Sequence, residues 1–401
     1  MQKVYRPLCE GVIQNLIEIF NHQKTANFVV DKSLKNNKKW GSKDRKFVAN
    51  ATYEIVRNWR YIKFCASIDE RKIKQPAQYW QMLGTWLVMA DYELPQWEEF
   101  ATIDKAAVVD LKGQDVEFKV KYSVTDWLNE YGAAQTGESW QSEMKAMSRE
   151  ADVFLRVNTS KISVEDCAFR LGEEGVEVEM VEGAEQALRL TERKRIDTTS
   201  VFKKGMIEVQ DAGSQLIASL LRPRSGEKII DACAGAGGKA LNLADWMRNK
   251  GEIVAMDVDG KKLTELAARA KRNRFDIIKT ELVKKEVLSK YGSWADKLLL
   301  DVPCSGSGTF KRNVDAKWKL KAEFMDNITE LQASLLQDYT KMLKSGGLLV
   351  YATCSIFKSE NQGQVQNFLA NNSNFKLVKD LQVLPSEQGW DGFYMALIKK
   401  K

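Results

Sequence analysis

The chain has 401 residues, which predicts two or three domains at the usual size of about 100–200 residues each. With 44% hydrophobic and 29% charged residues, its composition is that of a globular protein and excludes collagen-like, low-complexity and wholly disordered chains. The sequence contains no run of roughly 18 apolar residues, so we expect no transmembrane helix. The N-terminal stretch also lacks the apolar core of a signal peptide, so we expect a cytoplasmic protein with no membrane partner.

Two rare residue types restrict the chemistry. His22 is the single histidine, and a Ser-His-Asp triad or an imidazole metal site would have to use it. It lies in a helix-like segment far from any motif, so we expect no metal site and a reaction that does not use imidazole. The six cysteines are far apart and form no CxxC pair, which fits a reducing compartment and leaves thiols available for chemistry: Cys9, Cys65, Cys167, Cys233, Cys304 and Cys354.

The net charge of +7 is concentrated near the N-terminus. Residues 1–74 hold 16 basic and 7 acidic side chains, whereas the other 327 residues hold 45 and 47. Aromatic residues alternate with cations at 32–47 and 57–64, a composition that favours RNA, because cations bind phosphate and aromatic rings stack on bases. The alternative is a solvated helical face with its aromatics in a core. The candidate RNA contacts in this segment are Lys38, Lys39, Lys43, Arg57 and Arg60.

The first two predicted domains differ in their pattern. Residues 1–120 show apolar residues at helical spacing, with helices expected at 8–20, 43–66, 77–91 and 97–109. Residues 121–209 are predicted to form a helical linker, with Asp126 as a possible N-cap and a break at Gly132, followed by a small α+β domain.

From about residue 226 the pattern becomes a strict alternation of strands and helices, so residues 210–401 are predicted to form the third domain. Near-continuous apolar strands joined by helices indicate an α/β fold with a mostly parallel, Rossmann-like sheet. Two further strands close to each other in sequence predict an antiparallel edge. The expected strands are 227–234, 252–259, 277–283, 295–302, 346–354, 375–384 and 392–401, with helices at 239–250, 261–274 and 322–344.

A glycine-rich turn, DACAGAGGK (231–239), joins the first strand of this domain to its first helix. Its GxGG spacing matches neither the GxGxxG fingerprint nor a P-loop. About twenty residues later Asp257 ends the second strand, where an acid can bind ribose hydroxyls. The combination predicts a nucleoside-bearing cofactor, either a dinucleotide or S-adenosylmethionine, unless the turn is purely structural.

Two cysteines follow the fourth and fifth strands of the domain. Asp301 and Cys304 come directly after one strand, and Cys354 directly after the next. Because the carboxyl ends of neighbouring parallel strands border the ligand crevice, we expect both thiols to face the cofactor site. A thiol with a lowered pKa there could act as a nucleophile, although many cysteines are simply small buried hydrophobes.

The motifs DACAGAGGK, AMDVD, LLDVPCSGSGT, KRNVDAKW and YATCS resemble those of the RNA cytosine-C5 methyltransferases of the Nol/Nop/Sun group. The resemblance extends over residues 120–401, and the N-terminal helices are similar to the antitermination-factor-like RNA-binding domain of bacterial members. It implies methylation of small-subunit ribosomal RNA, alone or in a partly assembled subunit, with S-adenosylmethionine as cofactor and the protein as a monomer.

The resemblance also implies individual roles. Cys354 attacks cytosine C6, Cys304 assists release of the product, Asp301 binds the N3/N4 edge of the base, and Lys239 faces the same pocket. The implied cofactor contacts are Cys233, Ala234, Gly235, Ala236, Gly237, Gly238, Lys239, Asp257, Lys262, Glu286 and Asp301.

The chain departs from the family pattern at three places. One is Glu286, which stands where the family usually has an aspartate after the third strand. Gly235-Ala236 replaces the usual Ala-Pro, so we expect a more flexible turn. The KRNVDAKW motif has Lys311 where arginine is common, and the candidate phosphate contacts here, unless they are solvated surface, are Lys311, Arg312 and Lys317. The alternatives to this function are methylation of another RNA such as tRNA, methyl transfer to an amine or a protein, and a non-catalytic RNA-binding assembly factor. The cysteine pair with Asp301 favours the cytosine methyltransferase.

Overall fold

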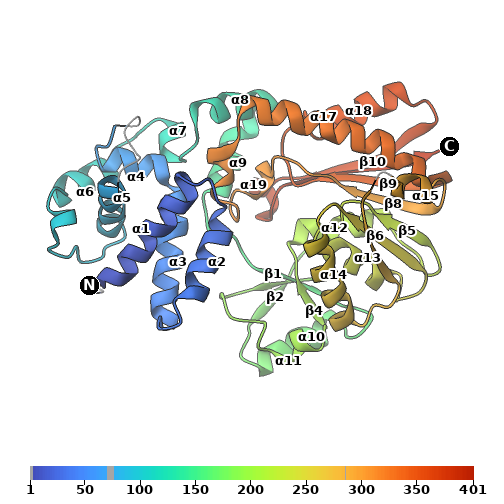
Figure 1. The fold of residues 1–401 in the computed structure, drawn as a ribbon, viewed down its shortest axis with the longest axis horizontal. Helices are drawn as coiled ribbons and strands as arrows, with labels where there is room; N and C mark the ends of the chain where they lie inside the picture. The colour runs from blue at the N-terminus through green and yellow to red at the C-terminus, as the bar shows by residue number, and fades with distance from the viewer. Residues whose placement is uncertain (1–2, 70–75, 285) are drawn as a thin grey trace. The chain divides into compact units, whose positions relative to one another are not determined.

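A computed structural model of the chain describes residues 3–69, 76–284 and 286–401 (Figure 1). Contacts between Cα atoms divide the chain into two units. The helical unit comprises 1–150 and 310–321, and the sheet unit comprises 151–309 and 322–401. This division differs from the predicted boundaries at 120/121 and 209/210, because the linker helices group with the N-terminal helices and the small α+β domain groups with the large sheet. In the described part of the chain, no helix is long and apolar enough to cross a membrane.

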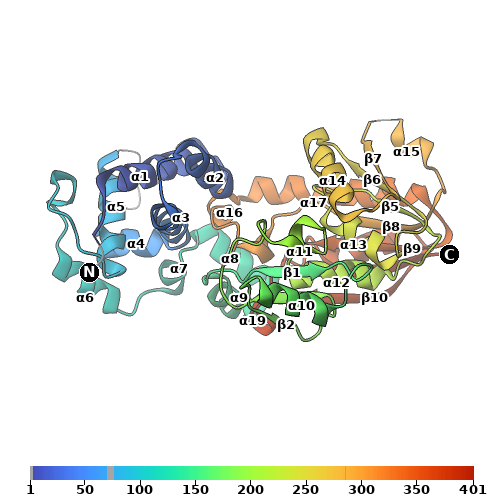
Figure 2. The same ribbon diagram turned by 90° about the horizontal axis from the view of Figure 1, so that it is seen from below.

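The core of the helical unit lies between α1, α3 and α5 (Figure 2). Leu16, Ile55 and Leu83 are fully buried in it. Trp59 closes this core by stacking on Phe20, with ring centroids 3.8 Å apart. The helices are α1 (Arg6–Phe20), α2 (Ala26–Asn36), α3 (Ser42–Arg57), α4 (Trp59–Cys65), α5 (Pro76–Met89), α6 (Lys105–Gly113), α7 (Phe118–Lys121), α8 (Asp126–Thr136), α9 (Trp140–Met147) and α16 (Ala316–Lys319), with 3-10 turns η1 (Glu98–Phe100) and η2 (Gly137–Ser139).

Several local features of this unit were predicted wrongly or not at all. Helix α2 was not predicted, and the helix expected at 43–66 is interrupted at Asn58, between α3 and α4. Thr125, rather than Asp126, caps α8, because its hydroxyl accepts the Leu128 N–H. Gly132 lies inside α8 instead of breaking it, where the absence of a side chain leaves room for the ring of Trp140.

The segment 310–321 belongs to the helical core, although in the chain it lies between two elements of the sheet unit, β8 (Ala295–Asp301) and α17 (Ala322–Tyr339). Val314 is fully buried in that core, and Trp318 Nε1 donates to the Val56 carbonyl at 2.9 Å. Asp315 accepts the Ala26 N–H at 3.1 Å and thereby satisfies a backbone donor at the start of α2. Both the apolar and the polar residues of this short stretch therefore contact helices that are more than 250 residues away in sequence.

The small α+β domain is the first part of the sheet unit. Its four described strands are antiparallel where they pair and follow the order β2-β3-β1-β4, and α10 covers them with Leu171 packed on Leu155 and Leu188. Its elements are β1 (Phe154–Val157), α10 (Val164–Glu173), β2 (Val178–Met180), β3 (Ala187–Leu190), α11 (Ser200–Lys203) and β4 (Ile207–Val209).

The large sheet confirms the predicted α/β fold with an antiparallel edge. Among the described residues it has seven strands in the order β10-β11-β9-β8-β5-β6-β7, in which β9, β8, β5, β6 and β7 run parallel and β11 runs antiparallel to both of its neighbours. The strands are β5 (Lys228–Asp231), β6 (Glu252–Asp257), β7 (Ile278–Leu282), β8 (Ala295–Asp301), β9 (Leu343–Thr353), β10 (Phe375–Val383) and β11 (Phe393–Lys400).

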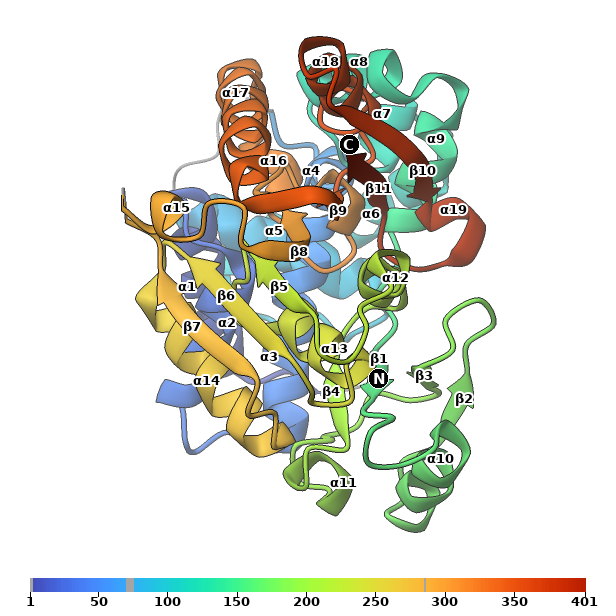
Figure 3. The same ribbon diagram turned by 90° about the vertical axis from the view of Figure 1, so that its right-hand side faces the viewer.

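Helices cover both faces of this sheet, which is why its inner strands β6, β8 and β9 are mostly apolar (Figure 3). Ile229 packs toward α12 and α13, whereas the next residue, Ile230, packs toward α17. The strands β8 and β9 pair up to Asp301 and Ala352, so their carboxyl ends lie together. The helical elements are α12 (Ala212–Leu221), α13 (Gly238–Trp246), α14 (Gly260–Asn273), α15 (Val287–Lys290), η3 (Ser307–Thr309), α17 (Ala322–Tyr339), η4 (Thr340–Met342), α18 (Gln362–Asn371) and α19 (Pro385–Gln388).

Candidate active site

Two free thiols lie side by side where β8 and β9 end. Cys304 follows β8, Cys354 follows β9, and their sulfur atoms are 3.2 Å apart. The backbone supports this arrangement, because the Gly308 N–H donates to the Cys354 carbonyl at 3.0 Å. Both side chains are partly exposed, so a ligand can reach them. The structure thus brings together two cysteines that are fifty positions apart in sequence.

The surroundings of Cys304 keep its thiol protonated. The hydrogen bond with Cys354 raises the pKa of the Cys304 thiol well above its usual value, and burial and the charges of Cys354 and Glu360 raise it further. Cys304 therefore stays protonated and can donate its S–H to the sulfur of Cys354.

Lys239 and Asp301 form an ion pair beside the thiols. Lys239 lies in the first turn of α13, and its Nζ is 2.5 Å from Asp301 Oδ2. Burial opposes the lysine charge, but the charges of Asp301 and Cys354 outweigh it and raise the pKa of Lys239. The ammonium group is therefore kept charged between a carboxylate and the Cys354 sulfur, where it favours a thiolate.

The glycine turn between β5 and α13 has a backbone that few other residues could adopt. Gly237 has φ +86°, and a Cβ there would lie 2.3 Å from the Cγ of Leu266. Gly235 also has a positive φ, +54°, and faces open space. No side chain caps the start of α13, so the N–H groups of its first turn are available to an anionic group of a ligand.

Two acids border this turn. Asp257, at the end of β6, accepts the Gly235 N–H at 2.8 Å and the Asp259 N–H at 2.8 Å. Asp231, at the end of β5, is fully buried, and neither of its carboxylate oxygens has a well-formed hydrogen bond within the described residues. Burial, and next the charge of Asp301, raise the pKa of Asp231 to about 7. An unpaired buried carboxylate fits a cationic group of a ligand.

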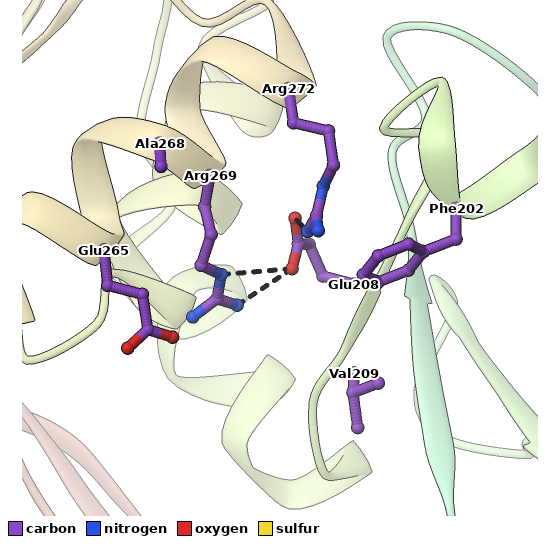
Figure 4. Close-up of a pocket in the computed structure, with 7 residues that line it drawn as sticks. All are labelled: Phe202, Glu208, Val209, Glu265, Ala268, Arg269 and Arg272. Carbon is purple, nitrogen blue, oxygen red and sulfur yellow. Dashed lines mark hydrogen bonds and ion pairs between the residues drawn. The ribbon is translucent and has the colours of Figure 1, made fainter. Parts of the chain in front are cut away.

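Two arginines hold the glycine turn by hydrogen bonds to its backbone carbonyls. Arg269 Nη1 donates to the Ala236 carbonyl at 2.7 Å, and Arg156 Nη1 donates to the Gly238 carbonyl at 2.6 Å. Arg269 is itself fixed by the buried carboxylate of Glu208, which also pairs with Arg272, on one wall of a pocket of about 480 Å³ (Figure 4). These bonds hold two carbonyls of the turn in position, although the turn lacks the proline that the family usually has. The expectation of a more flexible turn did not take them into account.

The other predicted cofactor residues lie around the same sheet edge. Cys233 is partly buried, and burial and the charge of Asp231 raise the pKa of its thiol. The Ala234 N–H donates to the Met256 carbonyl at 2.9 Å. Lys262 is exposed in the first turn of α14, and Glu286 is exposed directly before α15. The roles of these four residues in cofactor binding stay predictions.

The helical unit corrects part of the predicted RNA-contact set. Arg57 is buried, with Nη2 donating to the Lys311 carbonyl at 3.1 Å, and Lys311 is buried as well. Lys317 is also buried, and its Nζ donates to the carbonyls of Arg57 (2.7 Å) and Tyr122 (3.2 Å). Burial, and next the charge of Arg57, lower the pKa of Lys317 to about 7. These three cations are therefore structural and cannot reach a phosphate at the surface.

The remaining predicted RNA contacts divide into two groups. Arg60 donates to the Val124 carbonyl and to Asp126, both at 2.9 Å, and Arg312 is partly buried. The side chains of the other three are exposed on the loop after α2 and at the start of α3: Lys38, Lys39 and Lys43. Residues 1, 2 and 70–74 of the basic segment lie outside the described residues.

Comparison with known proteins assigns the chain to a family. Residues 218–399 match the family described as 16S rRNA methyltransferase RsmB/F, and residues 124–197 match the ferredoxin-like domain of the RsmF/B-like methyltransferases. A ribosomal RNA small subunit methyltransferase B from Shewanella oneidensis is 31% identical over 296 residues, which cover 70% of this chain and 68% of that protein. The chain belongs to the RsmB/F family. This confirms the resemblance inferred from the motifs.

Two further relatives show how much of the family is matched. A ribosomal RNA small subunit methyltransferase B from Pasteurella multocida is 34% identical over 278 residues, 65% of this chain and 62% of that protein. The chain therefore spans less than two thirds of the length of that RsmB/F protein. A solved methyltransferase homolog protein from Pyrococcus horikoshii has 30% identity and a TM-score of 0.61, covering 68% of this chain and 94% of that chain.

Several residues of the site were not singled out by sequence reasoning. Asp231 is the first letter of the glycine-turn motif, so the motif itself carried the signal. Arg156, Glu208 and Arg269 come from three separate elements, and only their meeting in space relates them to the turn. Glu360, six residues after Cys354, carried no signal that distinguishes it from a surface glutamate.

Proposed function

We propose that this RsmB/F-family chain transfers the methyl group of S-adenosylmethionine to C5 of a cytosine in RNA, with small-subunit ribosomal RNA as the substrate class. The observation that carries the proposal is the pair of free thiols 3.2 Å apart beside the ion pair of Lys239 and Asp301. Methyl transfer to an amine needs no thiol, because the amine is already a nucleophile. Cytosine C5 becomes nucleophilic only after a nucleophile has added to C6.

The surroundings of Cys354 support its assignment as the attacking residue. The S–H of Cys304 and the ammonium group of Lys239 lie beside its sulfur, and both would stabilise a thiolate formed there. Its sulfur adds to C6, forming a C–S bond, and the electron pair of the C5–C6 double bond becomes available at C5 for the methyl group.

The same contacts give Cys304 a role in product release. Its pKa is raised mainly by the hydrogen bond to Cys354 and also by the charge of Cys354. Once Cys354 is bonded to C6, its charge has gone and its sulfur is a poorer acceptor, so the Cys304 pKa falls and its proton is lost to solvent. The Cys304 thiolate can then take the C5 proton, the C5–C6 double bond re-forms, and Cys354 leaves as a thiolate.

The residues around the glycine turn fit S-adenosylmethionine, which supplies an electrophilic methyl group when it is bound. The unpaired carboxylate of Asp231 suits its α-ammonium group, and the uncapped N–H groups of α13 suit its carboxylate. Asp257 is the last residue of β6, a position where an acid binds ribose hydroxyls in this class of sheet. Asp301 keeps part of its carboxylate exposed and would accept from the N4 amine and a protonated N3 of cytosine.

An exposed face of the helical unit suits the RNA. The aromatics expected to stack on bases are partly or largely buried, since Trp59 lies in the helical core and Trp40 packs against it. Phe28 is instead 55% exposed, and it lines a hollow of about 240 Å³ together with Lys32, Asn36 and Asn37. A ring beside cations and amides can stack on an unpaired base whose phosphates the lysines bind.

The catalytic proposal is tested by incubating the purified protein with ribosomal RNA and S-adenosylmethionine and reading cytosine methylation by sequencing. Cys354→Ala should form no methylcytosine and no covalent adduct, whereas Cys304→Ala should accumulate an RNA–protein adduct. Cys167→Ala, which removes a buried thiol of the small α+β domain, is the matched control and should retain activity. Methylation by Cys354→Ala at the wild-type rate would show that the mechanism is wrong.

The RNA surface is tested by the salt dependence of binding. Replacing Lys38, Lys39 and Lys43 by alanine should reduce the slope of log K against log salt by roughly 2–3, because each lost phosphate contact contributes about 0.7–0.9. Phe28→Ala should weaken binding without changing that slope. A triple alanine variant at exposed positions of β10 and β11 is the control: Lys376, Lys379 and Lys399. An unchanged slope in the first variant would assign its lysines to solvated surface.

A further inference from the structure

A buried carboxylate lies between the two loops that carry the thiols. Glu360 has no exposed surface. Its Oε1 accepts the Ser305 N–H at 2.7 Å and the Gln332 side-chain amide at 3.0 Å, and its Oε2 accepts the hydroxyls of Ser305 and Ser355. Each of these serines directly follows one of the two cysteines. A single side chain therefore holds the residue next to Cys304 and the residue next to Cys354.

The bonding of Glu360 explains how a charge can be kept there. An ionised carboxylate has about four acceptor positions, and four neutral donors occupy them. Hydrogen bonds to an ionised group are about twice as strong as those between neutral groups. The loop of Cys304 is also tied to α17, because Gln332 donates to the Pro303 carbonyl at 2.9 Å as well.

Further bonds between the loops start from the same serines. The hydroxyls of Ser307 and Ser355 are 2.8 Å apart, and the Ile356 N–H donates to the Ser307 hydroxyl at 3.0 Å. All of these serine groups are buried. Because the hydroxyls bond to Glu360 and to each other, the orientation of one loop is transmitted to the other through this single network.

We propose that Glu360 is a positioning residue that sets the spacing of the two thiols by clamping Ser305 and Ser355. The proposal rests on the proposed function, in which Cys304 and Cys354 act in turn on one cytosine. Both thiols lie on loops beyond the last paired residues of β8 and β9, so strand pairing alone does not determine their separation. A displacement of about 1 Å in such a site can lower a rate by about a hundredfold.

The test compares Glu360→Gln with Glu323→Gln, a change of the same kind at an exposed position in the first turn of α17. Glutamine keeps the volume of the side chain, and the serine hydroxyls can rotate to accept from its amide, so the variant is expected to fold. It loses the charge and therefore the strong bonds of the clamp.

Three quantities are measured on the full chain: the methylation rate at saturating RNA, the affinity for S-adenosylmethionine, and the rate of Cys304–Cys354 disulfide formation with diamide. Diamide takes up the two thiol hydrogens, and peptide mapping identifies the bond. In Glu360→Gln we expect the methylation rate to fall about tenfold or more and disulfide formation to slow several-fold, with cofactor affinity within about twofold of wild type. The control should match wild type in all three.

The outcomes separate this proposal from the proposed function. Wild-type rates of methylation and disulfide formation in Glu360→Gln would overturn the positioning role while leaving the methyltransferase intact. A wild-type protein that methylates no cytosine would overturn the proposed function, whereas the disulfide rates would still decide the positioning role. If Glu360→Gln loses cofactor binding altogether, Ser355→Ala removes a single donor and should show the same changes to a smaller degree. Unchanged rates in that variant would also overturn the proposal.

Discussion

Replacing Glu208 by glutamine should destabilise the sheet unit by about 2–4 kcal/mol. The Glu208 side chain is 3% exposed and pairs with two guanidinium groups that are 19% and 24% exposed. Glutamine keeps the volume but leaves Arg269 and Arg272 close together without their counter-charge. Breaking a buried ion pair by removing one partner costs about 3–5 kcal/mol, and partial exposure of both arginines lowers the expected loss to about 2–4 kcal/mol.

Hydrogen exchange of amides in β4 and α14 measures this loss in the full chain, because Glu208 lies in β4 and its partners Arg269 and Arg272 lie in α14. Glu265→Gln is the matched control: Glu265 lies on the rim of the same pocket and is exposed, so its replacement should change stability by less than about 0.5 kcal/mol (Figure 4). If the stability of Glu208→Gln also stays within about 0.5 kcal/mol of wild type, the ion pairs of Glu208 with Arg269 and Arg272 do not stabilise the fold.

The same pair of proteins gives a pH dependence. Burial opposes ionisation of Glu208, but the charges of Arg269 and Arg272 outweigh it and lower the pKa of the carboxyl group. A lowered folded pKa contributes stability that is fully present above the unfolded pKa of about 4.3 and is lost as the pH falls through the folded pKa. The difference between wild type and Glu208→Gln should be constant from neutral pH down to about 5 and then shrink. A difference that grows on acidification would contradict this assignment.

Two further variants test the glycine turn and the buried lysine. Gly237→Ala should weaken S-adenosylmethionine binding about fivefold or more by calorimetry, because positive φ costs a side-chain-bearing residue about 1–2 kcal/mol and the new Cβ meets Leu266. Gly172→Ala, at an open helical site, should leave the affinity unchanged. Lys317 has a pKa lowered by burial to about 7, so the unfolded chain binds more protons above that pH. Wild type should therefore gain about 2 kcal/mol over Lys317→Met between pH 7 and 9 in urea unfolding, and a pH-independent difference would refute it.

Local sequence patterns were sufficient for the architecture of the large sheet. Each predicted strand and helix from residue 226 onward corresponds to an element of the structure, because apolar runs of strand length and helical periodicity are properties of neighbouring residues. The helical unit was predicted less well. The mixture of Trp40 and Trp59 with cations favoured an exposed, RNA-stacking face, yet both rings pack in or against the core, since composition alone does not say which apolar neighbours are available.

The sequence by itself determined the order of strands and helices, the glycine turn and the two cysteines at neighbouring strand ends, because these depend on residues close together in the chain and on the general rule that parallel strands end at one edge. The tertiary structure alone decided which charged side chains are buried and bind other groups of the protein. Lys317 is buried among helices, Glu208 holds the arginine behind the glycine turn, and Glu360 joins the two cysteine loops. Such roles depend on partners far apart in sequence, and a charged residue looks the same in sequence whether water or a buried network satisfies it.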